Sequence, residues 1–221
     1  VGSSRLIKGL EEKEKEFLRF TTENVAQHII NGTALIIRRN KKEQSMISVC
    51  DNGKGFINKL NYSGRNNKPV SISEALVWGK GFGLKEGYNY SYNGKGFNFA
   101  VGYYADISVV ETLYEIVIVM PGKVIYQNVY PKILMTVRKN NLDRDGTQIT
   151  GYFYKGDEKN KELWTKKIIT EVEEEIFRRG VKNNFKPKEL LTDSVKSFSF
   201  EKGLVSKREY RPGIRFLEWS I

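Results

Sequence analysis

Cysteine and histidine are almost absent from this 221-residue chain, which contains one of each, Cys50 and His28. A single cysteine excludes an internal disulfide framework and a zinc site built from several cysteines. Because His28 is the one histidine, a serine–histidine–aspartate triad is possible only if His28 is its histidine. Strongly apolar runs such as residues 116–120 fall far short of the ~20 residues that a membrane-spanning helix needs. The composition therefore predicts a soluble intracellular domain, cytoplasmic or nuclear, with no membrane partner.

Chain length and aromatic content favour a folded domain with a core of its own. Single domains run to roughly 250 residues, and a chain of this size buries a core without disulfides or metals. The 12 tyrosines, 12 phenylalanines and 3 tryptophans argue against wholesale disorder.

Positive charge is in excess, with 37 Lys and Arg against 26 Asp and Glu, a net charge of +11. Residues 178–215 alone hold 11 basic and 4 acidic residues, so +7 of the +11 lies in this stretch. A basic region on a folded domain is typical of a polyanionic partner, with DNA or another nucleic acid first. The alternative is a solvated lysine-rich surface, and the composition leaves both open.

Hydrophobic periodicity predicts helices over residues 9–32 and 159–179, and a further helix over 97–104. Residues 33–50 have the pattern of a β-hairpin. Further strands are predicted at 107–112, 115–120, 123–127, 133–138 and 147–154. Consecutive strands flanked by helices predict an α+β fold, a two-layer α/β sandwich with helices on one face of a mixed sheet.

The predicted domain organisation follows the change in composition near Gly180. Residues 1–180 form one domain, and the basic residues 181–221 form a C-terminal extension or the start of a following domain. Glycines cluster after strands within the first domain, and the tetrapeptide Gly-Lys-Gly-Phe begins at Gly53, Gly79 and Gly94. Such clusters mark tight turns or close approach to a phosphate.

The common phosphate-binding motifs are not met by these glycines. The stretch that ends in Lys85 continues with Glu86, where a P-loop needs Ser or Thr. Gly94-x-Gly96 is not followed by the third glycine of a dinucleotide-binding fingerprint. A P-loop domain and a Rossmann domain are therefore both disfavoured.

Four other sequence elements follow one another in a characteristic order. They are Asn24 on the first predicted helix; Asp51, Gly53 and Gly55 in a turn after the hairpin; Gly94 and Gly96 at the start of the next helix; and Gly146 and Thr147 before a late strand. Over roughly residues 10–180, this order resembles the Bergerat-type ATP-binding domains of gyrase B subunits, ninety-kilodalton heat-shock chaperones, histidine kinases and MutL. Residues 93–111 look most like the chaperone, topoisomerase VI B and Microrchidia-like branches.

The resemblance implies that the turn after the hairpin and the late strand bind adenine. A carboxylate such as Asp51 can accept a hydrogen bond from the exocyclic amine of the base. Gly53 and Gly55 would let the backbone pack against the ring without a Cβ in between. The hydroxyl of Thr147 would share the water network at the same edge.

The resemblance also implies a phosphate and Mg²⁺ site. Its phosphate-binding backbone N–H groups would come from Gly94, Lys95, Gly96 and Phe97 at a helix N-terminus. Lys95 would add a positive charge beside the phosphates. Mg²⁺ takes few ligands from protein when phosphates and waters supply the others, and Asn24 would be its protein ligand.

One position departs from the family's pattern. Hydrolysing members carry a glutamate one helical turn before the asparagine, as general base for the attacking water. Here that position is Phe20, which cannot accept a proton. Glu23 is the candidate catalytic residue that remains, although it lies about 100° round the helix from Asn24. A shifted register would put His28 at the metal position and Asn24 at the base position, which is no better for hydrolysis.

Several functions remain open on the sequence alone. The first is an ATP-binding clamp or switch domain of a larger DNA-associated machine, with slow hydrolysis or none, in which nucleotide closes a lid over residues 58–93 and drives homodimerisation. The second is a catalytically degenerate domain that binds nucleic acid or protein, and the third is a chaperone ATPase domain. The plainest alternative is that the turn at Asp51 is an ordinary hairpin turn.

Overall fold

The computed structural model of the chain describes residues 9–28, 32–52, 57–58, 68–69, 72, 76, 95–112, 115–125, 128–138, 146–179, 196–199 and 214–220. The helices are α2 (Glu12–His28), α4 (Lys95–Phe99), the π-helix η1 (Ala100–Tyr104), the 3₁₀ helix η2 (Glu158–Asn160) and α5 (Lys161–Arg179). The strands are β1 (Gly32–Lys41), β2 (Gln44–Asp51), β3 (Ile57–Asn58), β4 (Lys68–Pro69), β5 (Ile107–Glu111), β6 (Glu115–Ile125), β7 (Asn128–Arg138), β8 (Gln148–Tyr154), β9 (Lys196–Ser199) and β10 (Ile214–Ser220). The predicted α+β class is confirmed.

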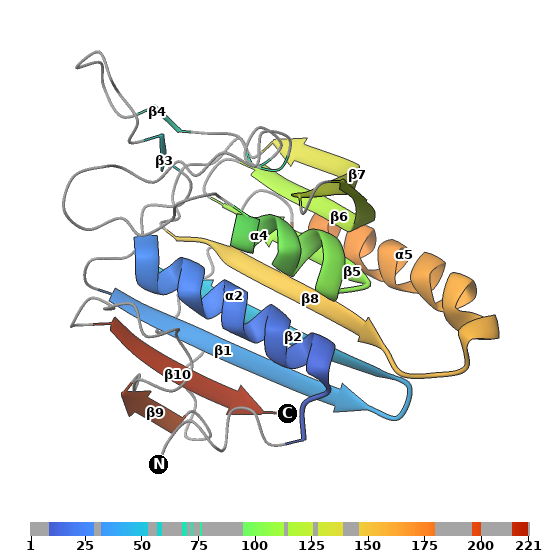
Figure 1. Cartoon of the computed structure of the whole chain (residues 1–221), viewed down its shortest axis with the longest axis horizontal. Helices are drawn as coiled ribbons and strands as arrows, with labels where there is room; N and C mark the ends of the chain where they lie inside the picture. Colours follow the sequence, from blue (N-terminus) through green and yellow to red (C-terminus); the bar gives the residue numbers. More distant parts are fainter. Residues whose placement is uncertain are drawn as a thin grey trace.

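Eight strands form the main sheet, in the order β7-β6-β5-β8-β2-β1-β10-β9 (Figure 1). The six strands from β7 to β1 pair antiparallel throughout. β10 lies parallel to β1, so the sheet is mixed. The short strands β3 and β4 pair with each other in a separate sheet.

The last two strands come from the segment that the sequence predicts to be an extension or the start of a following domain. β10 runs beside β1 from the pair Gly32–Ile214 to the pair Arg38–Ser220, and β9 pairs with β10. The sheet therefore continues into residues 214–220. Pairing between distant parts of a chain leaves no local pattern that a sequence window could detect.

One face of the sheet packs against α2, α4 and η1. Phe17 and Leu18 of α2 lie fully buried among apolar side chains of β1, β2 and β8. The ring of Phe17 meets Phe153 edge-on, at 5.4 Å between centroids. A Cβ at Gly151 would lie 2.7 Å from Phe17 Cζ, so glycine makes room for the ring.

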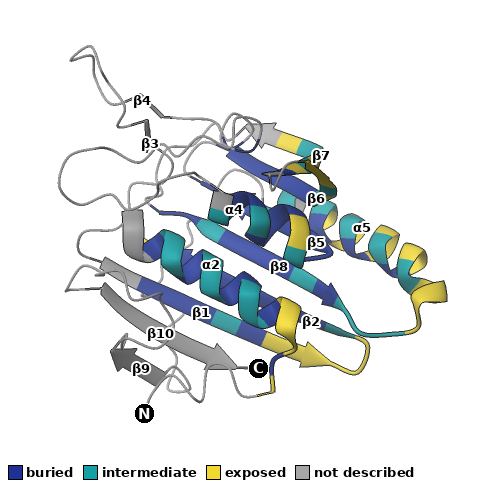
Figure 2. Ribbon diagram, in the orientation of Figure 1, coloured by how far each residue is buried: buried dark blue, intermediate teal, exposed yellow. Residues whose placement is uncertain are grey.

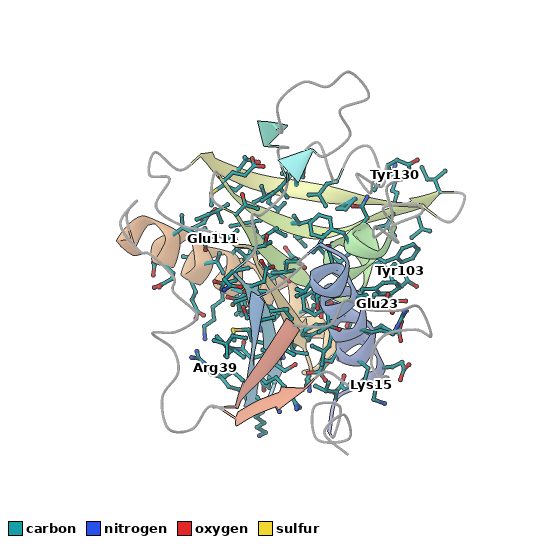
Figure 3. The ribbon with its side chains drawn as sticks, turned by 90° about the vertical axis from the view of Figure 1, so that its left-hand side faces the viewer. Lys15, Glu23, Arg39, Tyr103, Glu111 and Tyr130 are labelled. Atoms are coloured by element: carbon teal, nitrogen blue, oxygen red, sulfur yellow. The ribbon has the colours of Figure 1, made fainter. Side chains whose placement is uncertain are left out.

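The other face packs against α5. Its Trp164, Ile168 and Val172 form a second cluster with Ile118 of β6, whereas Val117 and Val119 belong to the cluster under α2. Since successive strand residues point to opposite faces, α5 and α2 lie on opposite sides of the sheet (Figures 1 and 3).

This arrangement differs from the expected sandwich with helices on one face only. The physical reason is visible in β6, where residues 116–119 are all buried, and Figure 2 shows buried positions along the central strands. A strand that is apolar at consecutive positions needs cover on both faces. Of the helices in the described ranges, none is long and apolar enough to cross a membrane.

Candidate functional site

Asp51 and Thr147 lie side by side where two neighbouring strands of the sheet end and begin. β2 ends at Asp51, and its antiparallel neighbour β8 begins directly after Thr147, with Cys50 opposite Gln148. The Thr147 N–H donates to Oδ1 of Asp51 at 3.2 Å, and the Asp51 N–H donates to the Thr147 carbonyl at 2.8 Å. Each residue is 7% exposed. The carboxylate is therefore held in one orientation at the strand end.

The same carboxylate lies on the sheet face that α2 covers. Asp51 alternates with Cys50 and shares its face with Val49 and Ile47, which belong to the cluster under α2. Asp51 therefore lies at the end of the sheet face that packs against α2.

Gly146 permits the contact between the two strand ends. Its φ is +109°, a conformation that residues with a Cβ rarely adopt. A Cβ on this residue would also overlap the carbonyl oxygen of Asp51. The Gly-Thr pair predicted from the sequence thus has a structural role as well, because only glycine lets the backbone of residue 146 pass so close to Asp51.

The four predicted elements converge at one end of the molecule. Figure 1 shows the carboxyl-terminal end of α2, the amino-terminal end of α4 and the start of β8 together at the left. The end of β2 lies there too, because Asp51 pairs with Ala34 near the start of β1. Asn24, half-buried in the second half of α2, belongs to this end. Gly53, Gly55 and Gly94 lie outside the described residues.

The predicted phosphate-binding residues occur at the start of α4. Lys95 is the first residue of this helix, and its side chain is outside the described part of the structure. Phe97 buries its side chain in the core, so any contact with a ligand would come from its backbone. A Cβ at Gly96 would lie 3.0 Å from Cδ1 of Phe20. Gly96 thus lets α2 and α4 pack closely.

Phe20, which stands where the resemblance predicts a general base, is a packing residue. Its ring stacks on Phe99, with 6.1 Å between centroids, and on Tyr104, at 5.7 Å. The guanidinium carbon of Arg19 lies 4.0 Å from the Phe20 ring centroid. The sequence marks this position only as a departure from a pattern; the structure shows that the side chain joins α2 to α4 and η1.

Glu23, the candidate catalytic residue, is bound to Arg19. Its Oε1 lies 3.1 Å from Nη1 of Arg19, and its side chain is 13% exposed (Figure 3). Arg19 also contacts Glu16 at 2.6 Å. Burial alone would lower the pKa of Arg19, but the hydrogen bonds and charges of Glu16 and Glu23 outweigh it and raise that pKa. Activation of water by Glu23 would have to compete with this ion pair.

Glu14 is a buried carboxylate that no sequence motif singles out. It is 1% exposed, accepts a hydrogen bond from the Glu11 N–H at 2.7 Å, and pairs with Lys155 at 3.1 Å. The hydroxyl of Ser45 also donates to it. A glutamate at the third position of a helix is a sequence signal for a cap at the helix start. Its contacts with Ser45 of β2 and with Lys155 after β8 cannot be read from the sequence. Glu14 therefore anchors the start of α2 to the sheet.

The described residues include only part of the predicted metal and DNA sites. Among those residues, no group of three or more His, Cys, Asp and Glu side chains could hold a metal ion. The predicted Mg²⁺ ligand, Asn24, is a single amide and suits an ion that phosphates and waters coordinate as well. Most of the basic stretch 178–215 lies outside the described residues.

Comparison with known proteins gives no family for the chain. No protein-family model matches it, and no curated protein is significantly similar to it in sequence. The residues and their geometry are therefore the basis for inferring a function.

Proposed function

We propose that the chain is a Bergerat-type ATP-binding domain, an α/β sandwich that acts as a nucleotide-operated clamp or switch in a larger DNA-associated machine. The observation that carries the proposal is the buried Asp51 carboxylate, held by the Thr147 N–H at the end of the sheet face that α2 covers. A fixed, buried acceptor is suited to reading one donor of a base, because a site built around a hydrogen bond rejects ligands that lack it.

In this proposal Asp51 accepts a hydrogen bond from the amine of adenine, and the Thr147 hydroxyl orders water beside it. Backbone N–H groups at the start of α4 hold the phosphates, and Lys95 adds positive charge. The Asn24 amide oxygen is the protein ligand of the Mg²⁺ that accompanies ATP, which supplies charge neutralisation at the phosphates when bound. Nucleotide closes the glycine-rich segment over the site and favours a homodimer.

ATP binding without fast turnover fits the residues better than a rapid ATPase. Phe20 occupies the position of the general base and is committed to the contact between α2 and α4. Glu23, the remaining candidate, is paired with Arg19. General-base assistance contributes about 10²–10⁴-fold in rate, so its absence leaves a slow enzyme or a binding switch.

A degenerate domain that binds nucleic acid or protein is the second candidate, and the packing of Phe20 is the observation that favours it. A chaperone ATPase domain is a third candidate, supported by the resemblance of residues 93–111 alone. The degenerate domain should not respond to nucleotide, whereas the other two candidates should.

Thermal denaturation of the full chain with ATP, ADP and GTP, each with and without Mg²⁺, tests the proposal. We expect ATP with Mg²⁺ to raise the melting temperature, because a ligand at a hundredfold excess over its Kd stabilises by about 2.7 kcal/mol. The isosteric change Asp51→Asn should abolish the shift, and GTP should give none. A wild-type chain that shows no shift at millimolar ATP would contradict nucleotide binding and favour the degenerate module.

A further inference from the structure

The β6–β7 hairpin exposes apolar and aromatic side chains at the end where its strands join. Val124, Ile125 and Tyr130 are 50%, 45% and 46% exposed. They are three of the five large hydrophobic residues that are exposed in the described part of the chain; Tyr103 and Leu163 are the others. Such a concentration on one hairpin is more than scattered surface apolar residues provide.

Past Glu115, at the start of β6, the charged residues of this hairpin are all cationic. No Asp or Glu occurs in the sequence from Ile116 to Leu142. Lys123 and Lys132 are exposed, and neither has an ion-pair partner among the described residues. The exposed lysines of α5 differ: Lys166 lies 2.8 Å from Glu162, and Lys167 lies 3.9 Å from Glu171. The lysines of the hairpin therefore keep their positive charge, whereas glutamates of α5 largely neutralise the lysines of that helix.

The strand register places the cations around one aromatic ring. Lys123 of β6 lies directly opposite Tyr130 of β7, so their side chains share a face and are cross-strand neighbours. Lys132 is two residues further along β7 and points to the same face. The register shifts between Met120 and Lys123, where a Cβ on Gly122 would overlap the Tyr130 carbonyl oxygen. Gly122 thus allows the close approach that sets Lys123 beside Tyr130.

Figure 3 shows Tyr130 at the outside of the molecule, far from Lys15 and Arg39. A half-exposed tyrosine ring flanked by two lysines combines the two features that bind single strands. Aromatic rings stack on bases of any sequence, and lysines contact the phosphates beside them. We propose that the β6–β7 hairpin surface, formed by Lys123, Ile125, Tyr130 and Lys132, binds single-stranded nucleic acid.

Other partners fit this surface less well. Pro131 and Lys132 interrupt the β7 edge, and both residue types oppose the addition of a further strand from a protein partner. A duplex offers phosphates to the lysines but no unstacked base to Tyr130. This inference goes beyond the proposed nucleotide site, because the hairpin surface shares no residue with Asp51, Thr147 or Asn24.

The test is fluorescence anisotropy of a labelled oligo-dT, titrated with the full chain at several salt concentrations and without ATP. We expect Tyr130→Ala to weaken binding at least about fivefold and Tyr130→Phe to restore it, because the ring and not the hydroxyl stacks. The double variant Lys123→Gln/Lys132→Gln should reduce the slope of log K against log salt by about 0.7 for each phosphate that is no longer neutralised. The control Lys166→Gln/Lys167→Gln removes the same charge from α5 and should bind as wild type does.

Three outcomes would overturn the inference. One is that the wild-type chain does not bind oligo-dT. Another is that Tyr130→Ala and Tyr130→Phe bind oligo-dT equally well, and that the hairpin and α5 lysine variants also bind with equal affinity. The third is binding to phosphatidylserine vesicles but not to oligo-dT, which would assign the surface to an anionic membrane. Circular dichroism on each variant separates weaker binding from a failure to fold. Because the titration contains no ATP, its outcome does not depend on whether the chain binds ATP.

Discussion

Asp51 and Thr147 hydrogen-bond each other twice across the ends of β2 and β8, once through backbone groups and once through the Asp51 carboxylate. The proposed adenine-binding side chain is thus also a structural link between neighbouring strands. A substitution at Asp51 acts on stability as well as on ligand binding, and the two effects need separate variants.

Asp51→Ala should reduce the free energy of unfolding by about 1–3 kcal/mol, because the Thr147 N–H loses its acceptor within a buried strand end. Asp51→Asn keeps a carbonyl oxygen in place of Oδ1 and should cost less. Urea denaturation of both variants measures the difference. Equal decreases would mean that the amide oxygen of Asn does not replace Oδ1 as the acceptor of the Thr147 N–H.

Gly146→Ala should be among the most damaging changes of a single methyl group in this chain. The residue has a φ of +109°, and its Cβ would overlap the Asp51 carbonyl oxygen. Backbone strain of this kind costs of order 1–3 kcal/mol, before the overlap is counted. Gly9→Ala is the matched control, since Gly9 has a φ of +75° but nothing near its added Cβ. Similar urea midpoints for the two variants would show that the contact with Asp51 is not restrictive.

Glu14→Ala should destabilise the chain by about 1–3 kcal/mol, because the Glu11 N–H and the Ser45 hydroxyl lose their acceptor and Lys155 keeps only the longer ion pair with exposed Glu11. Glu12→Ala is the control: Glu12 pairs with Lys15 in solvent, and exposed pairs contribute at most about 1 kcal/mol. Urea denaturation compares the two. Equal effects would indicate that the ion pair between Lys155 and Glu11 compensates for the loss of Glu14.

The helices and the antiparallel strands can be predicted because their signals are local. The apolar stripe of α5 and the apolar, β-branched run of β1 are readable within short sequence windows. The position of α5 cannot be predicted in this way, since a helical stripe does not state which sheet face it covers. β10 escapes prediction because its partner β1 lies at the other end of the chain.

The candidate site is predictable in its residues but not in its contacts. The order of Asn24, Asp51 and Thr147 is visible in the sequence, and the structure adds the bond between the last two. The aromatic stacking of Phe20 and the ion pair of Glu23 depend on packing between side chains, which no spacing rule specifies.

If the proposed nucleotide site is right, the full chain should bind ATP but release phosphate at a rate close to background, because Phe20 stands where the resemblance predicts the general base. Glu23→Ala should leave that slow rate unchanged if Glu23 serves only to hold Arg19. A steady-state phosphate-release assay measures both, with Asp51→Asn as the control for contaminating activity.

Phe20→Glu tests whether a carboxylate at residue 20 increases turnover. It would place a carboxylate among Phe99 and Tyr104, where burial and Glu16 already raise the pKa of Tyr104, so the variant should be less stable than wild type. Phe20→Leu, which keeps an apolar side chain, controls for the missing ring stacking. A gain in turnover by Phe20→Glu and not by Phe20→Leu would identify residue 20 as the base position. Robust wild-type turnover that Glu23→Ala abolishes would instead make Glu23 the base, and would require Arg19 to release it when ATP binds.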